Sequence, residues 1–183
     1  IEMKGSSRLG VPGLIDAMRQ GNVVIATAPG AAAVEARALL GFLEGAAERL
    51  LGEELKLPHV ATWWCGQADA RRHVLANFDR LAISSAFGAH AAGFHFEQPL
   101  LPAEMAPDER ARLYAAIEAR GQDFVGQEVA RLSTAPTWVD GRLAPRPFVL
   151  RVFVAATPKG WEVMPGGFCR ISDRPDARAV RMG

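Results

Sequence analysis

The sequence has only two cysteines, Cys65 and Cys169, and they lie far apart in the chain. Neither belongs to a Cys-x-x-Cys pair, so two free thiols in a reducing compartment are the simplest interpretation. Metal-ligand spacing is also lacking among the four histidines, which are His59, His73, His90 and His95. We therefore expect no metal ligand among these residues.

Long apolar runs are missing as well, because no segment approaches the roughly 20 residues that a membrane span requires. The net charge of +1 gives no general preference for nucleic acid or for an anionic membrane. The first residues do not show the basic, apolar and small-residue regions of a signal peptide. We expect a cytoplasmic protein with no nucleic-acid partner and no membrane partner.

What is present indicates a folded domain with a real core. Apolar residues make up 49% of the 183 residues and charged residues 22%, which is ordinary for one domain or one domain and a small second lobe. Residues 1–8 start abruptly and residues 177–183 stop without a closing cap. We expect the chain to be cut from a longer protein, whose remainder would then be one of its partners.

The N-terminal third has the pattern of a helix–strand–helix unit of α/β type. A helix is predicted at 9–20, followed by a buried parallel strand at 22–28 that is rich in Val and Ile. A long amphipathic helix is predicted at 31–51, where apolar residues recur every four positions. A further extended segment is predicted at 57–64.

The middle of the chain alternates short helices and strands. Helices are predicted at 69–77 and 107–120, and the second begins with Pro107 and ends before Gly121. A strand is predicted at 80–84. The Gly/Ala-rich stretch 86–95 has no clear period and predicts a mobile loop.

The final third changes to β structure. Two β segments are predicted within 123–139, and Asp140-Gly141 is a strong hairpin signal. A β-rich run at 147–156 and a turn at 157–160 complete the expected antiparallel sheet. The predicted fold class is therefore a mixed α/β (α+β) fold, with an N-terminal α/β unit joined to an antiparallel sheet.

Several short stretches occur in one order along nearly the whole chain. They are RLGVPGL at 8–14, GNVVIA at 21–26, LLGEEL at 50–55, ATWWCG at 61–66, FVGQE at 124–128, LSTAP at 132–136, PFVLRVF at 147–153 and MPGGFCR at 164–170. In this order and spacing the chain resembles the circularly permuted type 2 ATP-grasp family, which is similar to glutathione synthetase-like and glutathionylspermidine synthetase-like ligases.

The resemblance implies an ATP-grasp-like fold, with residues 1–79 as a pre-ATP-grasp-like unit and 80–183 as the lid and nucleotide-hinge region. It implies an ATP-dependent carboxylate–amine ligase that forms a peptide-type bond through an acyl phosphate. The implied cofactors are ATP and Mg²⁺, with the metal ligands outside this chain. The implied substrates are a small amino-acid-like or peptide-like carboxylate and an amine.

Two residues on the segment that resembles the nucleotide hinge, Gln127 and Glu128, are candidates for cofactor binding. The alternative is a plain strand with a surface Gln–Glu pair. Arg151 interrupts an apolar strand, where a buried charge needs a partner or a ligand. The fork of its guanidinium suits phosphate or carboxylate, so Arg151 is the catalytic candidate. The alternative is a salt bridge to Glu128 or Glu162.

Further nucleotide-binding candidates flank this strand. Arg146 and Arg170 supply cations, and Gly166 and Gly167 would let the backbone approach a ligand closely. A tight turn is the alternative for the glycine pair. Ser84 is included because it occupies a phosphate-contact position of the family.

Some positions depart from the family pattern. Ser84 and Ser85 stand where the family places Lys or Arg followed by Pro, and the loop that should cover phosphate contains a single glycine at 89–93. Thr27 stands where related sequences often have Asn. These departures favour an alternative function, a degenerate ATP-grasp domain that binds nucleotide or a protein partner without catalysis. A purely structural α+β module is a third interpretation.

Overall fold

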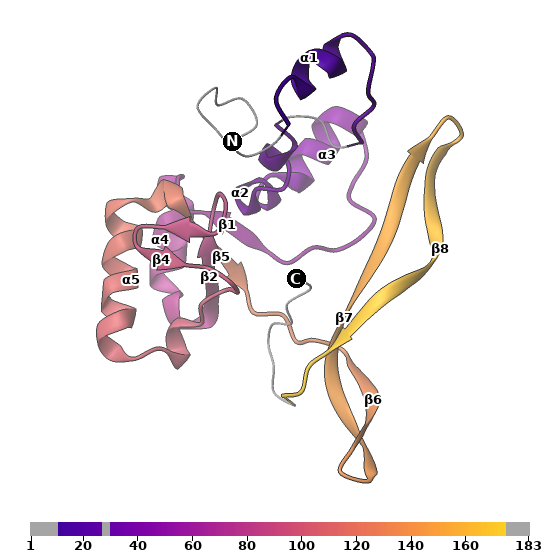
Figure 1. Cartoon of the computed structure of the whole chain (residues 1–183). Coiled ribbons are helices and arrows are strands. Elements are labelled where there is room, and N and C mark those ends of the chain that lie inside the picture. The colour runs from indigo at the N-terminus through magenta and orange to yellow at the C-terminus, as the bar shows by residue number, and fades with distance from the viewer. Residues whose placement is uncertain (1–10, 27–29, 175–183) are drawn as a thin grey trace.

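The computed structural model of the chain describes residues 11–26 and 30–174, and Figure 1 shows their arrangement. The helices are α1 (Leu14–Arg19), α2 (Arg37–Leu40), α3 (Leu43–Leu51), α4 (Ala68–Ala76) and α5 (Pro107–Ala119), with 3₁₀ segments at Ala31–Ala33, Phe78–Arg80, Pro102–Glu104 and Gly121–Asp123. The strands are β1 (Thr62–Trp64), β2 (Leu81–Ser85), β3 (His90–Ala91), β4 (Phe94–His95), β5 (Phe124–Glu128), β6 (Thr134–Val139), β7 (Arg142–Thr157) and β8 (Gly160–Ile171). This mixture of helices and antiparallel sheets confirms the predicted α+β fold class.

A small antiparallel sheet with the strand order β1–β5–β2 forms the centre of a compact unit, which we define as residues 37–128. Side chains alternate across β5, so Phe124 and Val125 enter opposite faces of the sheet. On one face Phe124 joins Val74 of α4 and Leu113 and Ile117 of α5 in a cluster of buried residues. On the other face Val125 packs with Ala38 of α2. The helices therefore cover both faces of a sheet only three strands wide.

The sheet combines residues from both sides of the predicted domain boundary at 79/80. Strand β1 pairs with β5, and β5 pairs with β2. The close approach of α4 to this sheet depends on Gly126, because a Cβ atom there would lie 2.6 Å from a Val74 methyl carbon. The division into 1–79 and 80–183 stays a prediction, and within the described residues the compact unit crosses it.

Two N-terminal expectations are wrong in the described residues. No strand forms at 22–26, where Val24 is 93% exposed because no neighbouring strand pairs with it. The last residues of that predicted strand, and Thr27 with them, lie outside the described residues, as do 1–10 and 175–183. The predicted continuous helix at 31–51 is divided into three pieces. It breaks at Gly41, where a Cβ atom would lie 3.0 Å from the Thr62 carbonyl oxygen.

The stretch predicted as a mobile loop contains the β3–β4 hairpin instead. Ala92 and Gly93 form its turn with φ angles of 46° and 83°, which suit the two-residue turns that match strand twist. Ala91 and Phe94 are buried in the core of the compact unit. The apolar side chains of the hairpin therefore fix a segment whose composition predicts mobility.

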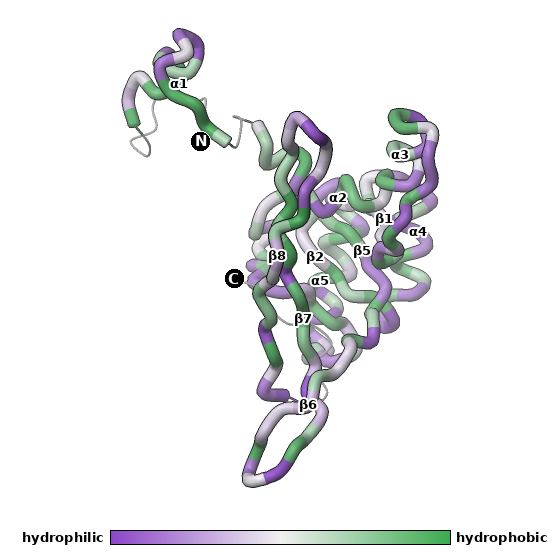
Figure 2. The backbone as a smooth tube through the Cα atoms, turned by 90° about the vertical axis from the view of Figure 1, so that its right-hand side faces the viewer, coloured by the Kyte–Doolittle hydropathy of each residue, from purple (hydrophilic) through white to green (hydrophobic). Residues whose placement is uncertain are grey.

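The C-terminal third forms a long antiparallel ribbon, which we define as β6, β7 and β8. Strand β7 pairs with β6 across the Asp140–Gly141 turn and with β8 across the turn that follows Thr157. The ribbon extends away from the compact unit (Figure 1). Figure 2 shows hydrophobic stretches along both long strands. Among their exposed side chains are Leu150, Val152, Phe153, Val154, Trp161, Val163, Met164 and Phe168.

None of the helices in the described residues is long and apolar enough to cross a lipid bilayer.

Candidate functional site

Two predicted site residues, Arg151 on β7 and Arg170 on β8, project from the same face of the ribbon. Arg151 lies opposite Phe168 in the antiparallel register, and Arg170 lies opposite Val149. Directly opposite residues share a face, and so do every second residue along a strand. The two arginines are therefore diagonal neighbours, at about the 7–8 Å separation of such Cα atoms.

The glycine pair lies beside Arg151, at an irregularity in the β7–β8 pairing. The register shifts between Val152 and Val154, and Gly166 has a φ angle of 106°. A Cβ atom on Gly167 would lie 2.7 Å from the Arg151 carbonyl oxygen, so any larger residue would force the strands apart. One hollow contains this whole group and is lined by Arg151, Phe153, Met164, Pro165, Gly166, Gly167 and Phe168.

No ion pair involves Arg151, Arg170 or Arg146 within the part of the chain that the structure describes. The salt bridge considered for Arg151 is therefore absent from these residues, and Glu162 instead accepts a hydrogen bond from the Thr157 hydroxyl at 3.3 Å. Two like charges side by side repel each other. Both arginines are exposed, and of the two only Arg151 lines the hollow. The burial expected for Arg151 is therefore wrong, and an anion bound between the two arginines would reduce their repulsion.

The other predicted residues are distributed elsewhere. Arg146 is five positions from Arg151 on the same strand, so it projects from the opposite face of the ribbon. Gln127 and Glu128 end β5 in the compact unit, and the Gln127 side-chain amide donates to the Thr62 hydroxyl at 3.0 Å. The Glu128 side chain is exposed. The predicted hinge residues and the paired arginines therefore belong to different sheets.

Ser84 is completely enclosed in the compact unit, and its Oγ has no hydrogen-bond partner in the described residues. It lies opposite Val125 in the register, so it faces the α2 side of the sheet. A ligand on the ribbon's arginine face cannot reach this hydroxyl without rearrangement of the compact unit. The role of Ser84 in nucleotide binding stays a prediction.

Replacing Ser84 with alanine is expected to leave stability unchanged or raise it by up to about 1 kcal/mol, because a buried hydroxyl without a partner carries a desolvation cost. Ser85→Ala is the matched control. The Ser85 hydroxyl donates to the Phe87 carbonyl oxygen at 2.9 Å, so its loss should cost about 1 kcal/mol. Urea unfolding of both variants measures the difference, and equal destabilisation by both would contradict this account of Ser84.

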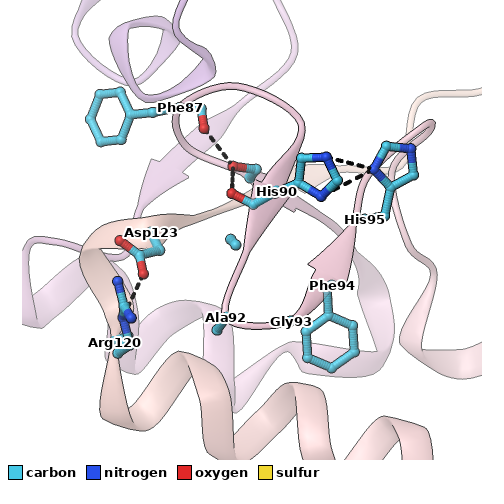
Figure 3. Close-up of a pocket in the computed structure, with 10 residues that line it drawn as sticks. Phe87, His90, Ala92, Gly93, Phe94, His95, Arg120 and Asp123 are labelled. Carbon is cyan, nitrogen blue, oxygen red and sulfur yellow. Dashed lines mark hydrogen bonds and ion pairs between the residues drawn. The ribbon is translucent and has the colours of Figure 1, made fainter. Parts of the chain in front are cut away.

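A second hollow lies under the β3–β4 hairpin (Figure 3). It has a volume of about 310 Å³ and is lined by Ser85, Phe87, His90, Ala91, Ala92, Gly93, Phe94, His95, Arg120 and Asp123. Arg120 Nε lies 2.7 Å from a carboxylate oxygen of Asp123. Prediction from the sequence missed this site because 86–95 has the composition of a loop. The pattern that could have revealed it is Ala92-Gly93 between two residue pairs, His90-Ala91 and Phe94-His95, that each hold one histidine and one apolar residue.

The cysteines differ in their surroundings. Burial raises the pKa of the Cys65 thiol to about 12, so it stays protonated at neutral pH. It packs within the core of the compact unit. Cys169 is exposed on β8, between the two arginine-bearing pairs. Cys65 is therefore a packing residue.

Comparison with known proteins gives one family and several longer relatives. The family model described as "Circularly permuted ATP-grasp type 2" matches residues 1–172. An uncharacterized protein of Mycobacterium tuberculosis is 34% identical over 91% of this chain, and the match covers 18% of that protein. An uncharacterized protein of Synechocystis is 30% identical over 95% of this chain and 35% of its own length.

A further relative from Frankia alni has the printed name "Putative glutamate--cysteine ligase 2-3". It is 33% identical over 88% of this chain, and the match covers 18% of the Frankia protein. The chain thus spans about a fifth to a third of the length of these relatives.

Proposed function

The chain belongs to the circularly permuted ATP-grasp type 2 family, and we propose that it supplies part of the nucleotide site of an ATP-dependent carboxylate–amine ligase. The observation that carries this proposal is the arginine face of the ribbon. Arg151 and Arg170 share that face, and Arg151 lines a hollow together with the glycine pair and apolar side chains. Guanidinium groups match phosphate oxygens in geometry and charge, and close backbone approach suits a polyphosphate.

In the proposed reaction a carboxylate oxygen of the substrate attacks the γ-phosphorus of ATP, and the bond to the bridging oxygen breaks to release ADP. The amine nitrogen of the second substrate then attacks the acyl carbon of the acyl phosphate. Phosphate leaves, the nitrogen loses a proton, and an amide remains. Arg151 and Arg170 would bind and orient the polyphosphate and offset the negative charge that develops on it.

Magnesium, when bound, neutralises phosphate charge in this chemistry. Magnesium prefers oxygen ligands, and the described residues contain no cluster of three or more His, Cys, Asp or Glu side chains placed to bind one ion. They therefore do not fit a magnesium site, and no residue of this chain is assigned to the ion. Its ligands are expected in the additional length that the relatives possess.

Hydroxylamine provides a direct test of this reaction class. The longest natural protein that contains these residues is incubated with Mg-ATP, mixed amino acids and hydroxylamine. Hydroxylamine converts an acyl phosphate to a hydroxamate. We expect hydroxamate and ADP to form in equal amounts, and both to fall at least tenfold in Arg151→Ala. ADP without hydroxamate for any carboxylate would contradict the ligase proposal.

A degenerate domain that binds nucleotide without catalysis is the second candidate. The observation that favours it is Ser84, a small enclosed side chain where the family places a phosphate-binding cation. This candidate predicts saturable ATP binding with neither hydroxamate nor ADP. The same incubation, read together with an ATP titration, separates the two functions.

A further inference from the structure

The β3–β4 hairpin places two imidazoles side by side at the protein surface. His90 and His95 are direct cross-strand partners. Cross-strand partners project from the same face, and the two ring centroids lie 4.4 Å apart. Figure 3 shows the rings facing each other at the rim of the hollow. The two histidines are five residues apart in the sequence, and an irregular loop would not hold them next to each other. The two-residue turn at Ala92-Gly93 makes them cross-strand neighbours.

The opposite side of the hairpin is held by the core. Ala91 and Phe94, the inner pair, are 6% and 8% exposed and belong to the main hydrophobic cluster. Beyond the hairpin, the Phe96 amide donates to the Ala89 carbonyl oxygen at 2.8 Å. The backbone that carries both imidazoles is therefore fixed before any ligand arrives, which lowers the entropy cost of binding one.

The separation of the ring nitrogens suits a shared metal ion. His95 Nδ1 lies at hydrogen-bonding distance, 3.3 Å, from each ring nitrogen of His90, and a bound metal ion would take the place of that hydrogen bond. Two imidazoles on a tetrahedral zinc ion, with bonds of about 2.0–2.1 Å, have their ligand nitrogens about 3.3–3.4 Å apart. A small rotation of the His90 ring would direct one of its nitrogens at the ion while the backbone stays in place.

Glu97 occupies the position of an orienting partner. Its Oε1 lies 3.6 Å from His95 Nε2, the ring nitrogen other than the one that faces His90. Metal-bound histidines typically present their second nitrogen to a carboxylate, carbonyl or water, which fixes the tautomer and raises ligand basicity. His95 thus has one nitrogen toward the candidate ion and one toward a carboxylate.

We propose that His90 and His95 bind a borderline transition-metal ion of the Zn²⁺ class, with His95 ligating through Nδ1 and Glu97 orienting its ring. Imidazole ligands select zinc, copper, nickel or cobalt over magnesium. Both histidines are exposed, so water or a ligand in the adjoining hollow completes the coordination. This site and the arginine face have no residue in common. The metal-site proposal therefore does not depend on whether the chain binds ATP.

Cobalt titration followed by visible absorption tests this site, with Zn²⁺ added afterwards to displace the Co²⁺. We expect one saturable equivalent in the unmodified chain. His90→Ala and His95→Ala should each weaken binding at least tenfold, and Glu97→Gln should weaken it about tenfold. His73→Ala is the matched control, because His73 is also an exposed histidine and its ring stacks on Trp63, away from His90 and His95 in the sequence. The cobalt affinity of this variant should equal that of the unmodified chain.

Thermal unfolding of each variant is followed by circular dichroism. A variant that stays folded and binds cobalt less tightly has lost a metal ligand, whereas an unfolded variant carries no information on the site. Copper-induced broadening of imidazole NMR signals gives a second readout, which should be confined to His90 and His95 at one equivalent. Unchanged cobalt affinity in the variant that lacks both histidines would overturn the proposal. No saturable binding at millimolar cobalt would overturn it as well.

Discussion

Replacing Phe124 with alanine should lower the free energy of unfolding by about 3–5 kcal/mol, the typical cost of removing a buried aromatic ring. Phe124 is fully buried at the first position of the central strand. Its ring lies 6.2 Å from that of Phe96 in an edge arrangement. Whole domains are stable by only about 5–15 kcal/mol, so this single change should leave the compact unit close to unfolding.

Phe87→Ala is the matched control for this prediction. Phe87 is 55% exposed, although its ring lies 6.4 Å from that of Trp64. Its removal should therefore cost less than about 1 kcal/mol. Guanidinium unfolding followed by far-ultraviolet circular dichroism measures both variants. A loss of less than about 1 kcal/mol for Phe124→Ala would mean that the sheet is not the centre of the core.

Removing the ribbon arginines should have the largest effect on ligand binding. Arg151→Ala is expected to weaken Mg-ATP binding at least tenfold, because one charge-assisted hydrogen bond contributes about 1.5–3 kcal/mol and tenfold corresponds to about 1.4 kcal/mol. The double variant Arg151→Ala/Arg170→Ala should weaken it about a hundredfold. Isothermal titration calorimetry measures the Mg-ATP affinity of both variants, in this chain and in the longest natural protein that contains it.

Two further variants control for charge and geometry. Arg142→Ala removes another exposed arginine, at the start of β7 and paired with Val139 of β6, and should leave ATP affinity unchanged. Arg151→Lys keeps the charge and loses the fork, so it should give an intermediate affinity. Equal losses for Arg142→Ala and Arg151→Ala would indicate nonspecific attraction in place of a site.

Where local pattern and packing agree, the fold could be predicted from the sequence. Helix α5 begins at Pro107 and ends before Gly121, so its start and stop signals stand in the chain itself. The Asp140–Gly141 turn is likewise set by its own residues, because Asp-Gly favours the positive φ angles that both residues adopt here. The two long hairpins of the ribbon followed from such turns, and the family assignment followed from the order of short motifs.

The failures come from information that is not local. The apolar run at 22–26 has the composition of a buried strand, but nothing in the described residues pairs with it. The helix expected at 31–51 is interrupted at Gly41 and Phe42, where the chain lies against the carbonyl of Thr62, a contact that the local pattern does not contain. The β3–β4 hairpin was missed because alanine rarely signals a turn, and burial of Phe94 decides the outcome.

The candidate site was predictable only in part, for a related reason. Strand parity places Arg151 and Arg170 on one face and Arg146 on the other, but parity can be applied only once the β7–β8 register is known. The register in turn depends on the bulge beside Gly166 and Gly167, which no local rule locates. The pairing of His90 with His95 required the hairpin, which the sequence did not predict.

Amide hydrogen exchange with and without Mg-ATP tests most directly whether nucleotide binds on the arginine face of the ribbon. The side chains of residues 150–156 of β7 and of all of β8 are exposed, so no packed core protects the backbone hydrogen bonds of this hairpin and its unliganded exchange should be fast. Bound nucleotide is predicted to slow exchange at 149–153 and 164–170, and Arg151→Ala should abolish that protection. Protection confined to the compact unit, or none at saturating Mg-ATP, would contradict the account.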